Sequence, residues 1–150
     1  MSPETLYLLI NAGILPGWFL LAFAPRARLT KLLVHSGAYP LIYGAIYTAL
    51  LCSALFFGQA ADGAGMSSLA GVMALFSHPA AVLTGWTHYL VFDLFIGAWV
   101  GRDAIRRGVP HFLVIPCLFL TLMFGPIGLA LYILVRALSK KGDASLFETA

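Results

Sequence analysis

His88 and Asp93 are the residues best suited to chemistry, because both lie inside an apolar stretch that runs from Ala80 to Asp103. An ionisable side chain in hydrocarbon costs about 2.5–3.5 kcal/mol on insertion scales, so it usually faces a bundle interior or a cavity. Five positions separate the two residues, which on a helix turns them roughly 140° apart. Asp93 instead shares a helix face with Trp86 and Tyr89. The pattern predicts a polar, aromatic-lined pocket with Asp93 and His88 as acid and base.

Each of these residues also has a purely structural interpretation. Asp93 could join helices by hydrogen bonds to a Tyr or Asn on another span, and a neutral His88 could bond a backbone carbonyl. If the pocket binds a substrate, its expected lining residues are Trp86, Tyr89, Asn11, Trp18, Tyr43 and Tyr47.

The composition shows which elements must position these residues. The 150-residue chain is 61% hydrophobic and 10% charged, with a mean hydropathy of +0.92. Soluble domains average about 25% charged residues, so this composition predicts a membrane protein. The net charge of +3 comes from basic residues beside the apolar segments, where lipid headgroups explain them better than nucleic acid does.

Four apolar segments are long enough to cross a bilayer as helices. They predict an all-α, polytopic membrane helix bundle in a single domain over residues 1–150, with spans at about 6–24, 39–58, 81–101 and 112–135. A shorter apolar segment, 66–77, is typical of an interfacial or re-entrant helix. The sequence FGPIG, residues 124–128, predicts a kink in the fourth span.

The basic residues orient the spans. Lys and Arg follow the first and third spans and are absent from 59–77, so the positive-inside rule predicts a cytoplasmic side for both basic loops and an outside amino terminus. A polar cluster of Arg102, Asp103 and Arg106 is expected at the cytoplasmic end of the third span. Four spans would leave the tail outside, although it carries Arg136 and two lysines, which conflicts with the rule.

The sequence argues against a resident metal. Four histidines, at positions 35, 78, 88 and 111, are spread over both sides and the middle of the predicted bundle, so they cannot share one ion. A metal on His88 with carboxylates stays an alternative. Cys52 and Cys117 fall inside spans and are expected to be small core residues rather than a disulfide. We therefore expect no cofactor.

Two long motifs, GWTHYLVFDLFIGAWVGRD and PCLFLTLMFGPIGLALYIL, together with AFAPRARLTK, resemble the abscisic-acid-deficient-four-like family. The resemblance extends from about Leu15 to about Val135. The motif positions carried over are Trp86, His88, Asp93, Asp103, Pro126 and Gly128. In plants this family is required to make neoxanthin from violaxanthin, which turns an epoxide into an allenic alcohol.

The resemblance implies an inner-membrane protein of carotenoid metabolism, and the compact chain without a recognisable transit peptide is typical of a bacterial form. The leading hypothesis is a carotenoid isomerase that uses acid–base chemistry. The alternatives are a metal-dependent, for example iron-dependent, enzyme of carotenoid cleavage or oxygenation, and a non-catalytic carotenoid- or lipid-binding subunit. Expected partners are a carotenoid or other isoprenoid lipid and either another membrane protein or a second copy of the chain.

Overall fold

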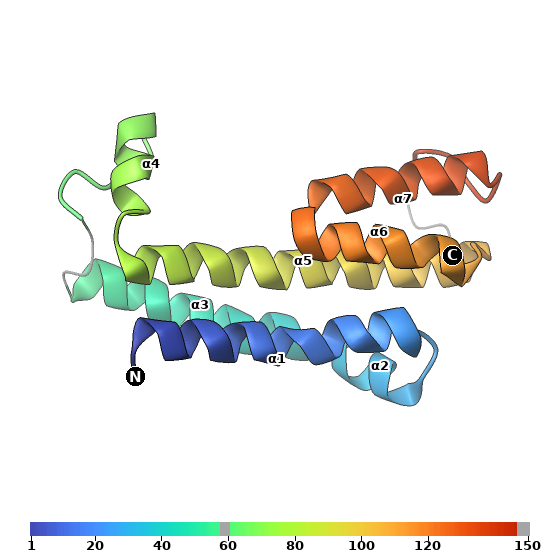
Figure 1. Ribbon diagram of the computed structural model, residues 1–150, viewed down its shortest axis with the longest axis horizontal. Coiled ribbons are helices and arrows are strands. Elements are labelled where there is room, and N and C mark those ends of the chain that lie inside the picture. The colour runs from blue at the N-terminus through green and yellow to red at the C-terminus, as the bar shows by residue number, and fades with distance from the viewer. Residues whose placement is uncertain (58–60, 147–150) are drawn as a thin grey trace. The chain divides into compact units, whose positions relative to one another are not determined.

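The computed structural model describes residues 1–57 and 61–146, and these form α-helices and no strands (Figure 1). The prediction of an all-α protein is confirmed. In chain order the helices are α1 (Pro3–Phe23), α2 (Arg28–Leu33), α3 (Ala38–Phe56), α4 (Leu69–Leu75), α5 (Pro79–Arg107), α6 (His111–Phe124) and α7 (Pro126–Leu138).

Three helical stretches are long and apolar enough to cross a membrane: Pro3–Phe23, Arg28–Phe56 and Pro79–Arg107. They match the first three predicted spans, except that position 58, the predicted end of the second, lies outside the described residues. Helix α1 continues through Pro16 without ending. The predicted number of four spans is not confirmed.

The fourth apolar segment forms two helices instead of one kinked span. Helix α6 has 14 residues and α7 has 13, so each is only about 20 Å long, against about 30 Å of hydrocarbon. Gly125 joins them with φ 44°, a left-handed conformation that favours glycine. Pro126 then occupies the first turn of α7, where its missing N–H costs nothing. The two helices pack against each other as a hairpin (Figure 1).

Gly128 explains how closely the hairpin packs. A Cβ at this position would collide with the backbone nitrogen of Thr121 and the carbonyl oxygen of Cys117, both in α6. The FGPIG sequence therefore supplies a turn residue, a helix start and a close-contact residue within five positions.

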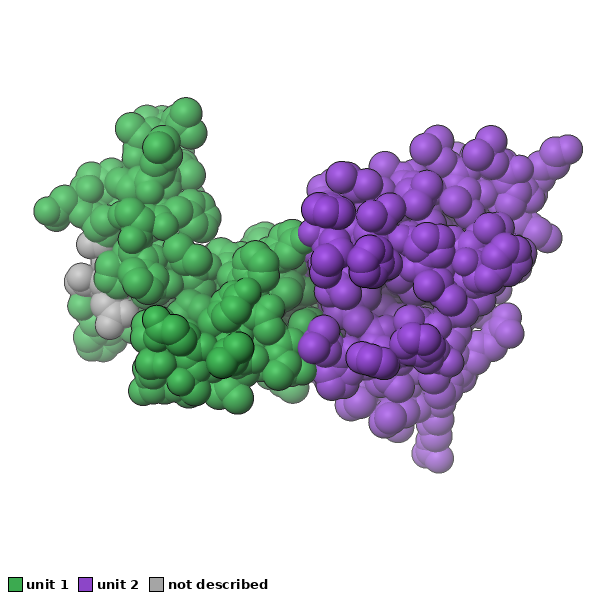
Figure 2. All heavy atoms as spheres, in the orientation of Figure 1, with its two compact units in different colours: residues 1–14, 39–91 green, residues 15–38, 92–150 purple. Residues whose placement is uncertain are grey.

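The described chain divides into two compact units, coloured separately in Figure 2. Unit 1 comprises residues 1–14 and 39–91, and its core includes Ile10, Ile14, Tyr43, Leu83 and Leu90. Unit 2 comprises residues 15–38 and 92–150, and its core includes Leu21, Leu94, Val100, Val114 and Tyr132. His88 belongs to unit 1 and Asp93 to unit 2.

Helix α4 lies in the apolar segment that was too short to be a span. The hydroxyl of Ser68 accepts a hydrogen bond from the backbone nitrogen of Gly71 at 3.1 Å, which caps the helix. The predicted short helix is therefore present.

Candidate functional site

Asp93 lies in α5 against the turn of the α6–α7 hairpin. Its side chain is buried, with 8% of the residue exposed. A Cβ built on Gly125 would lie 2.5 Å from the Oδ1 atom of Asp93, so only glycine fits between the α6–α7 turn and the carboxylate. Because α7 begins at Pro126, the positive end of its dipole lies beside Asp93 and favours a negative charge there.

Helix α7 runs in the same direction as the second half of α5. The contacts advance together along both helices: Asp93 meets Gly125, the ring of Trp99 meets that of Tyr132 at 5.8 Å, and Asp103 meets Arg136. The hairpin therefore starts at the carboxyl end of α5, reaches the level of Asp93, and returns to the same end.

Trp18 covers the next turn of α5 on the Asp93 side. Four positions beyond Asp93, a Cβ at Gly97 would lie 2.7 Å from the Trp18 ring, so the indole packs directly on the helix backbone. Trp18 is only 5% exposed, and its indole N–H has no hydrogen-bond partner in the described part of the chain. An unused buried donor of this kind can serve the oxygen of a bound molecule.

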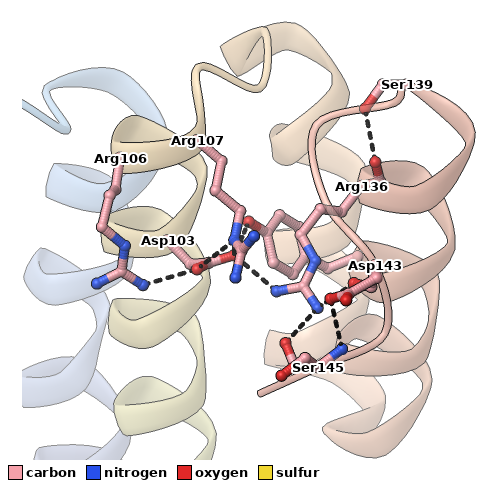
Figure 3. A network of polar contacts seen from close by, with 8 residues as sticks. Asp103, Arg106, Arg107, Arg136, Ser139, Asp143 and Ser145 are labelled. Atoms are coloured by element: carbon pink, nitrogen blue, oxygen red, sulfur yellow. Dashed lines mark hydrogen bonds and ion pairs between the residues drawn. The ribbon is translucent and has the colours of Figure 1, made fainter. Parts of the chain in front are cut away.

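A second polar cluster lies at the carboxyl end of α5 (Figure 3). The carboxylate of Asp103, whose side chain is 1% exposed, accepts hydrogen bonds from Arg106 at 2.7 Å and Arg107 at 2.9 Å. The predicted association of Asp103 with Arg106 is thus present, and Arg107 joins it. The hydroxyl of Tyr132 donates to Asp103 at 2.6 Å, and the guanidinium of Arg136 donates at 2.9 Å. Three guanidinium groups therefore surround one carboxylate.

Sequence reasoning missed Tyr132 and Arg136 as members of this cluster. Arg136 has a fully buried side chain, and its Nη2 atom also donates to the backbone oxygens of Asp143 and Ser145, which ties down the tail (Figure 3). The basic tail that contradicted the predicted topology was the available signal. Arg102, expected in the same cluster, instead lies 3.4 Å from Nδ1 of His35.

His88 has a different environment in unit 1. It is exposed, and its ring lies 5.9 Å from that of Tyr47. Asp93, by contrast, is buried. The two predicted catalytic residues therefore differ in burial, in agreement with the helical separation expected from their spacing.

The other predicted lining residues in unit 1 form an ordered aromatic group. The indole N–H of Trp86 donates to the side-chain oxygen of Asn11 at 3.1 Å, and the Trp86 and Tyr89 rings lie 5.3 Å apart. Tyr43 donates its hydroxyl to the backbone oxygen of Ile10 at 2.6 Å. Asn11 and Tyr43 thus use polar groups in hydrogen bonds inside unit 1, whereas Trp86 and Tyr89 are half-buried and pack ring against ring.

Within the residues that the structure describes, no three His, Cys, Asp or Glu side chains come together in a way that could hold a metal ion. The expectation of a metal-free protein stays a prediction.

The fold and these sites define an all-α protein with helices suited to a membrane. The model of the ABA DEFICIENT 4-like family matches residues 5–132, and the chain therefore belongs to this family. Protein ABA DEFICIENT 4, chloroplastic, from Arabidopsis thaliana is 25% identical over 138 residues. The alignment covers 85% of this chain and 59% of the relative, so the chain spans about three fifths of the relative's length. No solved structure matches significantly.

Proposed function

We propose that this protein is a membrane enzyme that isomerises a carotenoid epoxide, with Asp93 as the group that exchanges a proton with the substrate. Membership of the ABA DEFICIENT 4-like family supports the carotenoid class of substrate. The observation that carries the catalytic role is the burial of the Asp93 carboxylate at the hairpin turn, beside the start of α7. A buried carboxylate within an apolar helix is expensive and is usually kept for a function.

The chemistry suits this residue. Turning an epoxide into an allenic alcohol removes one proton from carbon and adds one proton to the epoxide oxygen, with no change of oxidation state. One carboxylate can take the first proton and return it as the second, so no co-reactant is needed. The positive end of α7 favours the ionised carboxylate that begins such a cycle. Trp18 would donate its unused indole N–H to the substrate oxygen.

The apolar body of a carotenoid needs aromatic and aliphatic walls. Within unit 1 we assign this role to Trp86, Tyr89 and Tyr47. The Trp86 and Tyr89 rings lie 5.3 Å apart, and the Tyr47 ring lies 5.9 Å from that of His88. The exposed position of His88 suits a contact with a molecule that approaches from the lipid.

A non-catalytic binding subunit is the second candidate, and the contact between the Asp93 carboxylate and Gly125 favours it too. If Asp93 only fixes the Gly125 turn against α5, its charge is structural and the protein would hold a carotenoid without changing it. Asp93→Asn separates the two functions, because Asn keeps the shape and the hydrogen bonding but cannot exchange the proton.

We also propose three membrane crossings, by α1, by α3 and by α5, with the α6–α7 hairpin entering the membrane from the cytoplasmic side. The parallel course of α5 and α7 supports this arrangement, because it returns Arg136 to the end of α5 that carries Arg106 and Arg107. The amino terminus would then be outside and the tail cytoplasmic. All basic clusters would lie on one side, as the positive-inside rule requires.

The test of function is the pigment profile of a carotenoid-producing bacterial host with and without the protein. We expect a new pigment with the wild type and with a control variant, Phe92→Leu, beside Asp93 but exposed. Asp93→Asn should lower the yield by about 10²-fold or more. An Asp93→Asn variant that makes the pigment as well as the wild type would exclude the catalytic role.

A further inference from the structure

A cavity of about 500 Å³ lies in unit 2, and neither Asp93 nor a member of the Asp103 cluster is among its described lining residues. Its walls come from the turn after α1 (residues 24–27), the end of α5 (Ala104, Ile105 and Gly108) and the link into α6 (residues 109–111). Its volume is in the range of small-molecule sites, about 300–1,000 Å³. Nothing in the proposed reaction uses this space.

The charge around the cavity has one sign. Arg26 lines it, and no acidic residue is among its described lining residues. In the described part of the chain Arg26 has no hydrogen bond and no ion pair, whereas Arg106, Arg107 and Arg136 all bind Asp103. The cavity therefore offers an arginine whose guanidinium is not used by the fold.

The rest of the lining combines groups that favour an anion with apolar surface. The Nε2 atom of His111 lies 2.8 Å from the backbone oxygen of Ala22, which holds the imidazole at the cavity wall. Helix α6 begins at His111, so the positive end of its dipole adds to the charge of Arg26. Pro25, Ile105 and Val109 supply apolar surface.

We propose that this cavity binds the phosphate of a glycerophosphate group, with Arg26 as its principal ligand. Arginine presents a planar fork of N–H donors that matches phosphate oxygens in pairs. The apolar wall accommodates the glycerol carbons. An anionic phospholipid headgroup and a soluble glycerol phosphate present the same chemistry, and a position at the cytoplasmic end of α5 would give access to both. The inference is independent of the proposed reaction.

The experiment measures the unfolding temperature of the purified full-length protein in neutral detergent during titration with three probes. The probes are short-chain phosphatidylglycerol, short-chain phosphatidylcholine and glycerol 3-phosphate. We expect phosphatidylglycerol to stabilise the wild type, and Arg26→Gln to weaken its apparent affinity about tenfold, the effect of about 1.4 kcal/mol.

Two further variants make the result specific. Arg28→Gln removes an exposed charge at the start of α2, two positions after Arg26. Arg28 does not line the cavity, so this variant should bind like the wild type. Ile105→Trp fills the cavity while keeping Arg26, and it should lose binding. If glycerol 3-phosphate stabilises the wild type as much as phosphatidylglycerol does, the ligand of the site is a soluble phosphate ester. Three results would overturn the proposal. The first is no stabilisation by phosphatidylglycerol or by glycerol 3-phosphate, and the second is stabilisation by phosphatidylcholine equal to that by phosphatidylglycerol. The third is an equal loss of affinity in Arg26→Gln and Arg28→Gln.

Discussion

Asp103→Asn should destabilise the protein more than Arg106→Gln or Tyr132→Phe, two other single changes in the cluster at the end of α5. The substitution keeps the shape of the side chain but removes the carboxylate that pairs with Arg136 within residues 1–57 and 61–146, and the Arg136 side chain is fully buried. Removing one partner of a buried ion pair costs about 3–5 kcal/mol, because the remaining charge is left without compensation. At roughly 2–4 °C per kcal/mol for a chain of this size, the unfolding temperature should fall by about 6–20 °C.

Two comparisons make this prediction quantitative. Arg106→Gln removes a cation that is 35% exposed and should cost at most about 1 kcal/mol. Tyr132→Phe removes a hydroxyl that donates to the charged Asp103 and should cost about 1.5–3 kcal/mol. The assay is reversible unfolding in mixed micelles, followed by helix content.

The double variant Asp103→Asn with Arg136→Met tests the physical cause. Because it contains no buried unpaired charge at this position, it should be more stable than Asp103→Asn alone. A double variant that loses the sum of both single effects would refute the reasoning. So would an Asp103→Asn variant that is as stable as Arg106→Gln, because both results would mean that water already solvates the cluster.

The remaining predictions concern the hairpin, the topology and the histidines. Gly128→Ala should cost about 1–3 kcal/mol in the same assay, because its Cβ would meet the α6 backbone; a neutral result would contradict the tight hairpin. Single cysteines placed at Ala61 and at Ala144 should differ in intact cells: an impermeant thiol reagent should label Ala61→Cys only and should reach Ala144→Cys after lysis. Labelling of Ala144→Cys in intact cells would show that the tail is outside. His88→Ala should strongly reduce pigment conversion, while His35→Ala should not. Equal effects of the two substitutions would contradict a catalytic role for His88.

The apolar segments predict the long helices correctly but do not predict the α6–α7 hairpin. Long apolar runs with few charges give α1, α3 and α5, since a backbone in lipid must pair internally. The run 112–135 has the same composition, but at Gly125 and Pro126 the chain reverses. Hydropathy alone cannot distinguish a kinked span from a hairpin of two half-length helices. The basic tail, which includes Arg136, was the sign of the reversal. The partner of Arg136, Asp103, is 33 positions earlier in the sequence.

The sequence predicted candidate residues for the site but not the contacts that these residues make. The burial of Asp93 follows from the cost of a carboxylate in an apolar helix. Its neighbour Gly125 comes from a turn 32 positions later, and no local pattern connects the two. Asn11 and Tyr43, expected as substrate contacts, make hydrogen bonds inside unit 1, and a buried group such as the Tyr43 hydroxyl needs a partner even without ligand. Their role as substrate contacts stays a prediction.

The central claim is that the protein isomerises its carotenoid without redox chemistry. The most direct measurement is the mass of the product that the purified, reconstituted protein makes from an epoxy-carotenoid without added metal or reductant. We predict a product with the mass of the substrate, one new hydroxyl group and no epoxide, formed by the wild type and not by Asp93→Asn. A product that is heavier by one or more oxygen atoms, or a shorter cleavage product, would contradict the account and favour a metal-dependent oxygenase.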